Sequence, residues 1–268
     1  MRLQDTIRAV RRSVSQMVVV NPADGSMRVI GSAFLTGQGR HAVTAKHVID
    51  AVPSGWELHA GLAGPDVDRA DVQVHASFIY IPCDLLDEDA RSDLALLELR
   101  MPPDATSVAL TVTVAPVNGG STEELDEGRT GPFKIAKGRL ADGTEVATSG
   151  FPLAAPALVT TAGTLASKFA PLDPADPDAG MRHLCDLTAT GGNSGGPVYR
   201  VSDGALVGVL VAGKLSPLAG GVGAQSVGLT LVTPSQDVVE LLVRNGIEPD
   251  RYKALPPQPK KAHPRKKR

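Results

Sequence analysis

One short stretch of the sequence places a nucleophilic hydroxyl among glycines: Gly191-Gly-Asn-Ser-Gly-Gly-Pro197. Glycine adopts backbone dihedrals that other residues avoid, so successive N–H groups here can be directed at one point. The amides of Gly192 and Ser194, on either side of Asn193, would then form an oxyanion hole for the charge that develops when Ser194 attacks a carbonyl group. A glycine-rich turn between two strands is the alternative interpretation of the same residues.

Serine requires a neighbouring base to remove its proton, and an imidazole base must itself be held in one tautomer by a carboxylate. Six histidines are available, at positions 41, 47, 59, 75, 183 and 263. His47 is the candidate, since it lies in Val43–Val48, where a strand is expected to give way to a helical turn. Asp93 begins the apolar run that ends at Leu99, where burial of its carboxylate can be expected. An ordinary surface or core histidine and a solvent-facing aspartate are the alternatives.

The order of the three residues along the chain separates the families of serine-based enzymes. The residues around Ser194 also satisfy G-x-S-x-G, the nucleophile motif of α/β-hydrolases. That fold needs its acid and its histidine after the serine, and the only later histidine is His263. An order of Asp, His and Ser, as in subtilisin-like enzymes, would require alternating helices and parallel strands, which the sequence does not offer. The arrangement that remains is His47, Asp93 and Ser194 on a chain rich in β-structure.

Composition excludes several classes of protein. The 268 residues are 42% hydrophobic, which excludes wholesale disorder, and no apolar run approaches the roughly 20 residues of a membrane span. Aromatic residues make up only 3%, which argues against a base-stacking platform for single-stranded nucleic acid. Cys83 and Cys185 are the only cysteines, and no HExxH or Cys/His cluster is present, so we expect neither a metal nor another cofactor. Because residues 1–12 lack the apolar segment of a secretory signal, we expect a cytoplasmic protein.

The elements that must position the candidate residues are mostly short strands. Eleven runs of β-type residues are expected at 14–20, 28–36, 41–45, 71–79, 93–99, 145–149, 157–165, 183–188, 198–201, 206–211 and 226–232. Many short strands at this spacing are typical of a sandwich or barrel of antiparallel hairpins. An amphipathic helix is expected before them, at residues 1–13, because Leu3, Ile7 and Val10 share one of its faces.

Breaks in the apolar pattern suggest where the domains lie. Residues 118–130 have no apolar periodicity and are expected to link a first β-unit, 14–117, to a second, 131–246. Within the second unit, Lys168–Gly180 holds three Pro and three Asp, and an exposed loop is expected there.

The second unit is expected to close with a helix. Thr233–Gln236 resembles a capping box with Pro234 at the first helical position, and Gly246 is placed to end the helix. Residues 247–268 are then expected to form a disordered basic tail, whose last thirteen residues carry six Lys or Arg and no acid. Electrostatic attachment of this tail to nucleic acid or to an anionic surface is the alternative to a merely solubilising terminus.

Taken together, the motifs resemble those of trypsin-like serine peptidases of the chymotrypsin fold, and most closely the bacterial HtrA-type protease domain without its PDZ module. The matching pieces follow the family's order and are Gly31–Leu35, Val43–His47, Asp93–Leu97, Ser149–Pro152, Gly192–Pro197 and Gly208–Gly213. The resemblance implies an all-β chain with two antiparallel six-stranded barrels, a C-terminal helix and an active site between the barrels. It also implies a catalytic triad in which His47 and Asp93 come from the first barrel. Ser194 and the oxyanion residues Gly192–Ser194 would come from the second.

The resemblance further implies a serine endopeptidase that cleaves extended or unfolded protein segments through an acyl-enzyme. Thr188 stands where trypsin itself has an aspartate, and Ala189 and Ala212 are its expected neighbours, so we expect a small or apolar pocket and cleavage after small or aliphatic residues. Val211–Gly213 would pair with the substrate backbone as a strand. Asn193 replaces the aspartate that pairs with a newly cut N-terminus in zymogen-type trypsins, so activation by that ion pair is not expected.

Three other functions remain open at this point. The foremost is a catalytically silent module that keeps the groove in order to bind extended peptides. An enzyme that acts only on esters and an adaptor directed by the basic tail are the others. The presence of His47, Asp93, Ser194 and the flanking glycines together favours the peptidase over these alternatives.

Overall fold

The computed structural model describes residues 2–36, 39–63, 78–101, 135, 140–155, 157–173, 176–217 and 224–249. The expected linker at 118–130, most of the strand expected at 71–79 and all but the first residues of the expected tail at 247–268 lie outside the described residues. Within the described part, no helix is long and apolar enough to cross a membrane.

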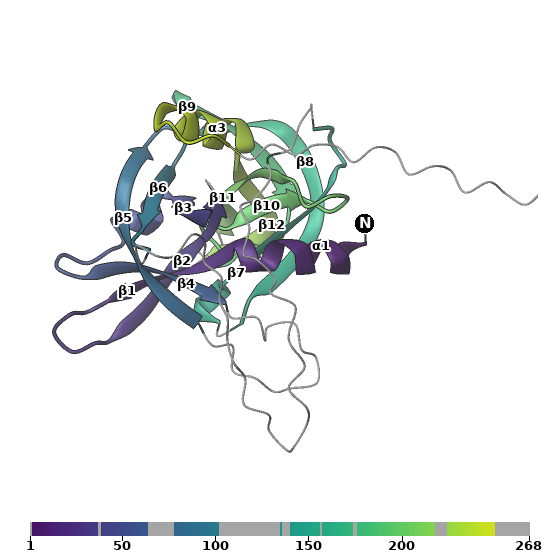
Figure 1. Ribbon diagram of the computed structural model, residues 1–268. Coiled ribbons are helices and arrows are strands. Elements are labelled where there is room, and N and C mark those ends of the chain that lie inside the picture. The colour runs from purple at the N-terminus through teal and green to yellow at the C-terminus, as the bar shows by residue number, and fades with distance from the viewer. Residues whose placement is uncertain are drawn as a thin grey trace, which may run out of the picture.

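The first half of the chain forms a closed antiparallel barrel with the strand order β1-β2-β3-β6-β5-β4 (Figure 1). Its strands are β1 (Val14–Val20), β2 (Met27–Thr36), β3 (His41–Ala45), β4 (Glu57–Ala63), β5 (Phe78–Asp89) and β6 (Leu94–Leu99). Apolar side chains such as Met17, Leu35, Leu62 and Leu97 fill its interior. The barrel is therefore packed with aliphatic residues, as a chain with few aromatic residues requires.

The second half forms another closed antiparallel barrel, with the strand order β10-β11-β12-β9-β8-β7. Its strands are β7 (Glu145–Gly150), β8 (Val159–Asp173), β9 (Asp176–Asp186), β10 (Pro197–Arg200), β11 (Leu206–Pro217) and β12 (Ala224–Pro234). Val146, Leu165, Val198 and Val232 are among the buried residues of its core. The expected fold class, two six-stranded barrels with a C-terminal helix, is confirmed.

The two barrels share a third apolar cluster. Phe34 and Leu94 of the first barrel pack in one cluster with Phe151 and Tyr199 of the second, and Leu241 of the C-terminal helix joins them. Burying apolar area between the barrels fixes their relative position, because that area would otherwise be returned to water. Segments of the two barrels that meet at this interface are thereby held in fixed positions relative to each other.

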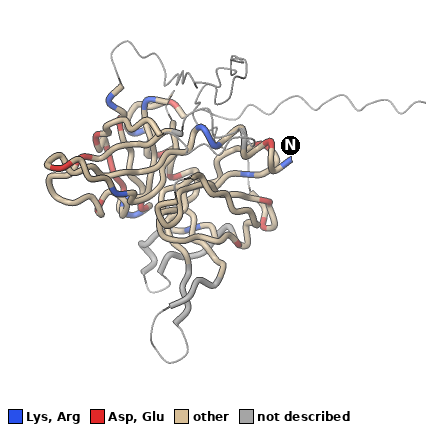
Figure 2. The backbone as a smooth tube through the Cα atoms, turned by 90° about the horizontal axis from the view of Figure 1, so that it is seen from below, with Lys and Arg blue, Asp and Glu red and all other residues tan. Residues whose placement is uncertain are grey.

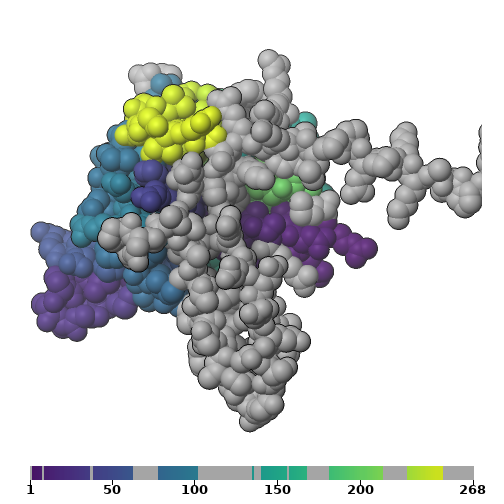
Figure 3. Space-filling model, in the orientation of Figure 1, coloured from purple at the N-terminus to yellow at the C-terminus, as the bar shows by residue number. Residues whose placement is uncertain are grey.

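Among the described residues, three α-helices accompany the barrels. α1 (Leu3–Val10) continues into the 3₁₀ turn η1 (Arg11–Ser13) and lies beside the second barrel, where the Thr6 hydroxyl donates to the carbonyl oxygen of Val201 at 2.6 Å. α2 (Lys46–Asp50) follows β3 directly. α3 (Ser235–Arg244) follows β12 and packs against β11 and β12 of the second barrel and β5 and β6 of the first, whose blue atoms lie beside the yellow helix in Figure 3.

Several local expectations are wrong. The strand expected at 157–165 continues to Asp173 in β8, and β9 begins at Asp176, so most of the loop expected at Lys168–Gly180 is a paired hairpin. Thr233 does not cap α3: it lies in β12, and Pro234 is the N-cap and lacks a side-chain hydrogen bond. Gly246 does follow the helix, with a φ of 70°.

Charged residues of both signs are interspersed along the described backbone (Figure 2). Asp84 pairs with Arg100, and Arg200 pairs with Asp203. Binding of nucleic acid or an anionic surface by the tail at 247–268 stays a prediction, because all but its first three residues lie outside the described part of the chain.

Candidate active site

His47 and Asp93 meet through two separate contacts. Nδ1 of His47 lies 2.7 Å from Oδ2 of Asp93, and the backbone N–H of His47 donates to Oδ1 at 3.0 Å. A carboxylate in this position accepts a hydrogen bond from Nδ1–H, which keeps the ring proton on Nδ1 and leaves Nε2 free to act as a base. The imidazole side chain is 44% exposed and the carboxylate 24%, so Asp93 is partly buried while His47 faces solvent.

The pairing of β3 with β6 brings these two residues together. Ala45 and Leu94 are register partners at the ends of these antiparallel strands, so the residues next to them, Lys46 and Asp93, also meet. The N–H of Lys46 donates to the carbonyl oxygen of Asp93 at 3.1 Å. Asp93 has a φ of 54°, a left-handed conformation that aspartate adopts more readily than most residues. This turn at the head of β6 directs its carboxylate to α2.

Ser194 lies in a tight loop between β9 and β10. The N–H of Asn193 donates to the carbonyl oxygen of Thr190 at 3.1 Å, and the N–H of Gly196 donates to that of Asn193 at 2.9 Å. The N–H of Gly195 donates to the carbonyl oxygen of Leu210 in β11 at 2.8 Å. The glycine-rich segment is therefore an ordered turn anchored to its own barrel.

The same loop is bound to the first barrel. The N–H of Ser32 in β2 donates to the carbonyl oxygen of Ser194 at 2.8 Å, and the Ser32 hydroxyl donates to that of Gly192 at 2.7 Å. Gly195 fits against β3 so closely that a Cβ atom there would lie 2.8 Å from the amide nitrogen of Ala45. The backbone at Ser194 therefore lies beside the strand end from which His47 follows. No hydrogen bond joins the Ser194 hydroxyl to the His47 ring among the residues that the structure describes.

Two amides of the loop are available to a ligand. The N–H groups of Gly192 and Ser194 donate to no acceptor within the described part of the chain, whereas those of Asn193, Gly195 and Gly196 are all engaged. Gly192 has a φ of 98°, and a Cβ atom there would collide with the carbonyl oxygen of Phe151, so only glycine fits. Of the three residues expected at the oxyanion hole, Gly192 and Ser194 therefore keep donors free for a carbonyl oxygen.

The Asn193 side chain lies in the interior and carries no charge. It is buried, and its Oδ1 atom has no hydrogen-bond partner among the described residues. Ser32 and Gly150 surround it, since a Cβ atom at Gly150 would lie 2.8 Å from the Ser32 hydroxyl oxygen and 2.9 Å from Oδ1 of Asn193. The loop is thus held by backbone hydrogen bonds and by packing rather than by an ion pair at this residue.

The residues expected to bind substrate lie in two adjoining segments. Ala189 follows β9, and Gly213 of β11 lies against it, because a Cβ atom at Gly213 would be 3.5 Å from the carbonyl oxygen of Ala189. Thr188 precedes Ala189, and its carbonyl oxygen accepts from the Thr161 hydroxyl at 3.1 Å. Val211 is buried and lies at a break in the β11–β12 register, where Leu210 pairs with Val232 and Ala212 with Leu231. All five side chains at 188, 189 and 211–213 are uncharged.

Sequence reasoning missed some residues of this neighbourhood. Ser32 bridges the two barrels, since its hydroxyl also accepts from the N–H of Phe151 at 3.0 Å, yet the sequence marks it only as part of Gly31–Leu35. Leu153 and Ala154, which follow Phe151, both have positive φ angles, and the N–H of Leu153 donates to the carbonyl oxygen of Gly191. The residue types at these positions do not predict these contacts or backbone conformations.

Neither cysteine supplies an alternative nucleophile. Burial raises the pKa of the Cys83 thiol and of the Cys185 thiol to about 12, so both stay protonated near neutral pH. Within the described residues, no three His, Cys, Asp or Glu side chains gather in a group that could hold a metal ion. Ser194 therefore remains the candidate nucleophile that the sequence predicts.

A family model described as a trypsin-like peptidase domain matches residues 31–209. This range covers more than half of the chain, includes parts of both barrels and contains His47, Asp93 and Ser194. No curated protein matches the chain significantly.

Proposed function

The chain belongs to the family of trypsin-like peptidases, and from this membership we propose that it is a serine endopeptidase with Ser194 as nucleophile, His47 as general base and Asp93 as the residue that orients His47. One observation carries the proposal. The first barrel holds the His47–Asp93 pair at the end of β3, and the backbone of Ser194 from the second barrel lies against that same strand end.

In the proposed reaction, Nε2 of His47 takes the proton of the Ser194 hydroxyl as Oγ bonds to the carbonyl carbon of the substrate. The negative charge on the carbonyl oxygen is stabilised by the N–H groups of Gly192 and Ser194. His47 then gives its proton to the leaving amine nitrogen as the C–N bond breaks, which leaves an acyl-enzyme. Water next gives a proton to His47 and attacks the acyl carbon, and the proton returns to Oγ of Ser194 as the acid product leaves.

The proposed substrates are extended segments of proteins. Val211–Gly213 would offer its backbone as a partner strand, which requires the substrate to be unfolded or looped at the cleavage site. The close approach of Gly213 to Ala189 and the absence of charge at Thr188 support a small, uncharged pocket. We therefore propose cleavage after small or aliphatic residues.

The proposed enzyme needs no newly cut N-terminus for its activity. The neutral side chain of Asn193 cannot form the ion pair that such activation uses, and the Ser194 loop is supported by Ser32. This feature agrees with the HtrA-type branch of the family, to which we propose that the chain belongs.

A fluorophosphonate probe tests the proposal, because it phosphonylates only a serine that a base has activated. We expect one probe per chain, located at Ser194, and no labelling of Ser194→Ala or His47→Ala. Ser54→Ala, which removes an exposed hydroxyl elsewhere, is the matched control and should label like the parent protein. If the folded parent protein stays unlabelled and still binds extended peptides, the proposal is wrong and the silent peptide-binding module replaces it.

A further inference from the structure

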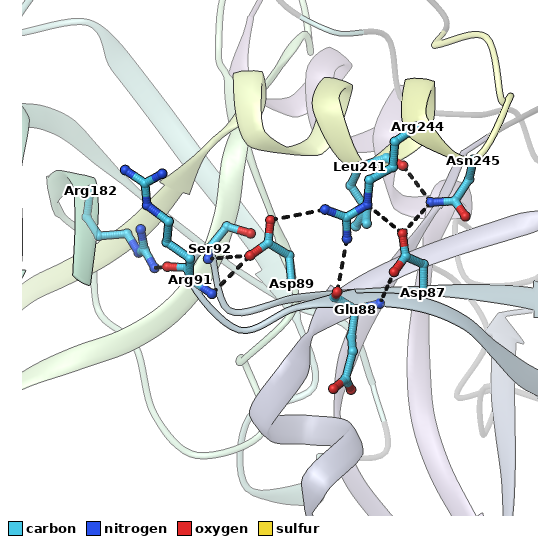
Figure 4. A network of polar contacts seen from close by, with 9 residues as sticks. All are labelled: Asp87, Glu88, Asp89, Arg91, Ser92, Arg182, Leu241, Arg244 and Asn245. Atoms are coloured by element: carbon cyan, nitrogen blue, oxygen red, sulfur yellow. Dashed lines mark hydrogen bonds and ion pairs between the residues drawn. The ribbon is translucent and has the colours of Figure 1, made fainter. Parts of the chain in front are cut away.

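The backbone conformation of Asp93 needs support from outside its own strand. Its left-handed φ of 54° is unfavourable for a residue with a side chain, and such conformations persist only where the surroundings fix them. The contacts to Lys46 and His47 lie on one side of Asp93. On the other side, the chain enters from residues 87–92, the end of β5 and the turn that follows it (Figure 4).

Two side chains of the second barrel bind the two residues that immediately precede Asp93. Nη2 of Arg182, in β9, donates to the carbonyl oxygen of Arg91 at 2.8 Å (Figure 4). The hydroxyl of Thr233, in β12, donates to the carbonyl oxygen of Ser92 at 2.7 Å. Consecutive carbonyl groups are thus held from the opposite barrel, which fixes the direction in which the chain reaches Asp93.

The end of α3 and the residue that follows it make contacts with an earlier part of the same segment. Nε of Arg244 lies 2.6 Å from Oδ2 of Asp87, and its Nη2 donates to the carbonyl oxygen of Glu88 at 2.9 Å. Asn245 donates to the same Asp87 carboxylate at 2.6 Å. Nη1 of Arg244 also lies 3.4 Å from Oδ2 of Asp89, whose Oδ1 accepts from the N–H groups of Arg91 and Ser92. These exposed contacts support the same turn, whereas Arg182 and Thr233 bind the carbonyl groups of the two residues next to Asp93.

Arg182 is an unusual residue to find buried. Its side chain is 1% exposed, its Nε has no hydrogen-bond partner and no carboxylate lies within ion-pair distance among the described residues. Burial lowers the pKa of its guanidinium, an effect that the more distant charges of Asp237 and Asp93 oppose. An apolar residue could fill this space without the loss of hydration that burial of a guanidinium entails. The arginine is therefore better explained by the carbonyl group of Arg91 that its Nη2 binds.

We propose that Arg182 and Thr233 are positioning residues for Asp93. They fix the residues before Asp93 so that its carboxylate meets both the ring and the backbone of His47. The His47–Asp93 pair, although built entirely from the first barrel, then depends on the docked second barrel. The expected effect on catalysis rests on the proposed function, whereas the expected effect on the geometry of the His47–Asp93 pair does not.

Nuclear magnetic resonance tests the geometric part. The proton shared by Nδ1 of His47 and Oδ2 of Asp93 should give a far-downfield resonance, which His47→Ala identifies by removing it. The spectra are recorded in the Ser194→Ala background, so that they do not depend on turnover. We expect the resonance to persist in Thr233→Ser, which keeps the hydroxyl, and to be lost or shifted in the isosteric Thr233→Val and in Arg182→Met. An unchanged resonance in Thr233→Val overturns the proposal even if Arg182→Met does not fold.

Kinetics test the catalytic part. With a peptide substrate, Thr233→Val should lower kcat by about tenfold to a hundredfold, the range expected from a small misplacement of a catalytic group, and leave KM within about twofold. Thr233→Ser should restore most of the kcat. Arg100→Met, which removes an exposed guanidinium bound to Asp84 on the first barrel, is the matched control and should not change either constant. Equal kcat values for Thr233→Val and Thr233→Ser would contradict the proposal. If the parent protein cleaves nothing, the proposed function fails and the resonance alone decides this inference.

Discussion

Replacing Asp93 by asparagine tests the central feature of the site, the double contact with His47. The two carboxylate oxygens have different partners: Oδ1 accepts the backbone N–H of His47 at 3.0 Å, and Oδ2 faces Nδ1 of the ring at 2.7 Å. An asparagine has only one side-chain oxygen. We expect this oxygen to accept from the backbone N–H of His47, because that group can only donate. The amide NH₂ then faces Nδ1 and donates to it, which moves the ring proton to Nε2.

With its proton on Nε2, His47 cannot accept the proton of the Ser194 hydroxyl. In a triad of this type the corresponding change lowers kcat by about 10⁴-fold, which equals about 5 kcal/mol of transition-state stabilisation at 1.36 kcal/mol per tenfold. Asparagine tolerates the left-handed φ of this position as well as aspartate does, so the fold should survive. The loss of kcat should therefore occur with little change in KM or in the midpoint of thermal unfolding.

The assay is the rate of cleavage of a chromogenic peptide with alanine or valine before the scissile bond. Asp50→Asn is the matched control, because it neutralises another carboxylate of the same region, one that pairs with Lys46 and is 56% exposed. Asp50→Asn should keep the rate of the parent protein within about twofold, as expected when an exposed ion pair is removed. If Asp93→Asn retains more than about a tenth of the parent rate, Asp93 does not set the tautomer of His47 and the reasoning fails.

Two further substitutions test the oxyanion loop and the contact of α3 with the first barrel. Gly192→Ala should lower kcat by about 10²-fold or more, because the new Cβ atom collides with the carbonyl oxygen of Phe151 and turns one oxyanion donor away; peptide turnover and probe labelling measure it, and an unchanged rate would contradict the assigned hole. Arg244→Met should change the pH dependence of stability. Hydrogen bonds from Arg244 and Asn245 lower the pKa of Asp87 below its ordinary 3.8, so their contribution is present above that pH and is lost as pH falls through the lowered value. Urea unfolding between pH 3 and 7 should therefore show a shallower acid loss in Arg244→Met, and parallel curves for the two proteins would refute this role.

The sequence predicts most of the strands because their apolar runs end at Gly, Pro or Asp. β1 and β3 begin and end at the predicted residues. The sequence does not predict β4, and the strand expected at 71–79 overlaps β5 only at its first two residues. β5 lacks a clear apolar run because it contains Pro82 and ends in an acidic stretch, while its partner β6 supplies the buried face. The sequence also does not predict the outer part of the β8–β9 hairpin. Pro and Asp are common in loops, and only the pairing of the two strands with each other shows that this segment is a hairpin.

Some residues of the candidate site are likewise predicted by a local pattern of the sequence, and others are not. Ser194 and its glycines form a continuous motif, and His47 and Asp93 lie at recognisable ends of apolar runs, so their residue types and order suffice to name them as candidates. Ser32, Arg182 and Thr233 act through contacts with residues far away in the sequence. No local periodicity encodes such contacts, and for Thr233 the sequence predicts a helix cap that its hydroxyl does not make.

The contact of α1 with the second barrel has a consequence for biosynthesis. The Thr6 hydroxyl has its acceptor at Val201, 195 residues later in the chain. At the usual pace of translation, about 5–20 residues per second, roughly 10–40 s pass before that acceptor is made. Until then the Thr6 hydroxyl lacks this acceptor, so α1 cannot complete its contact with the second barrel while the chain is still being made.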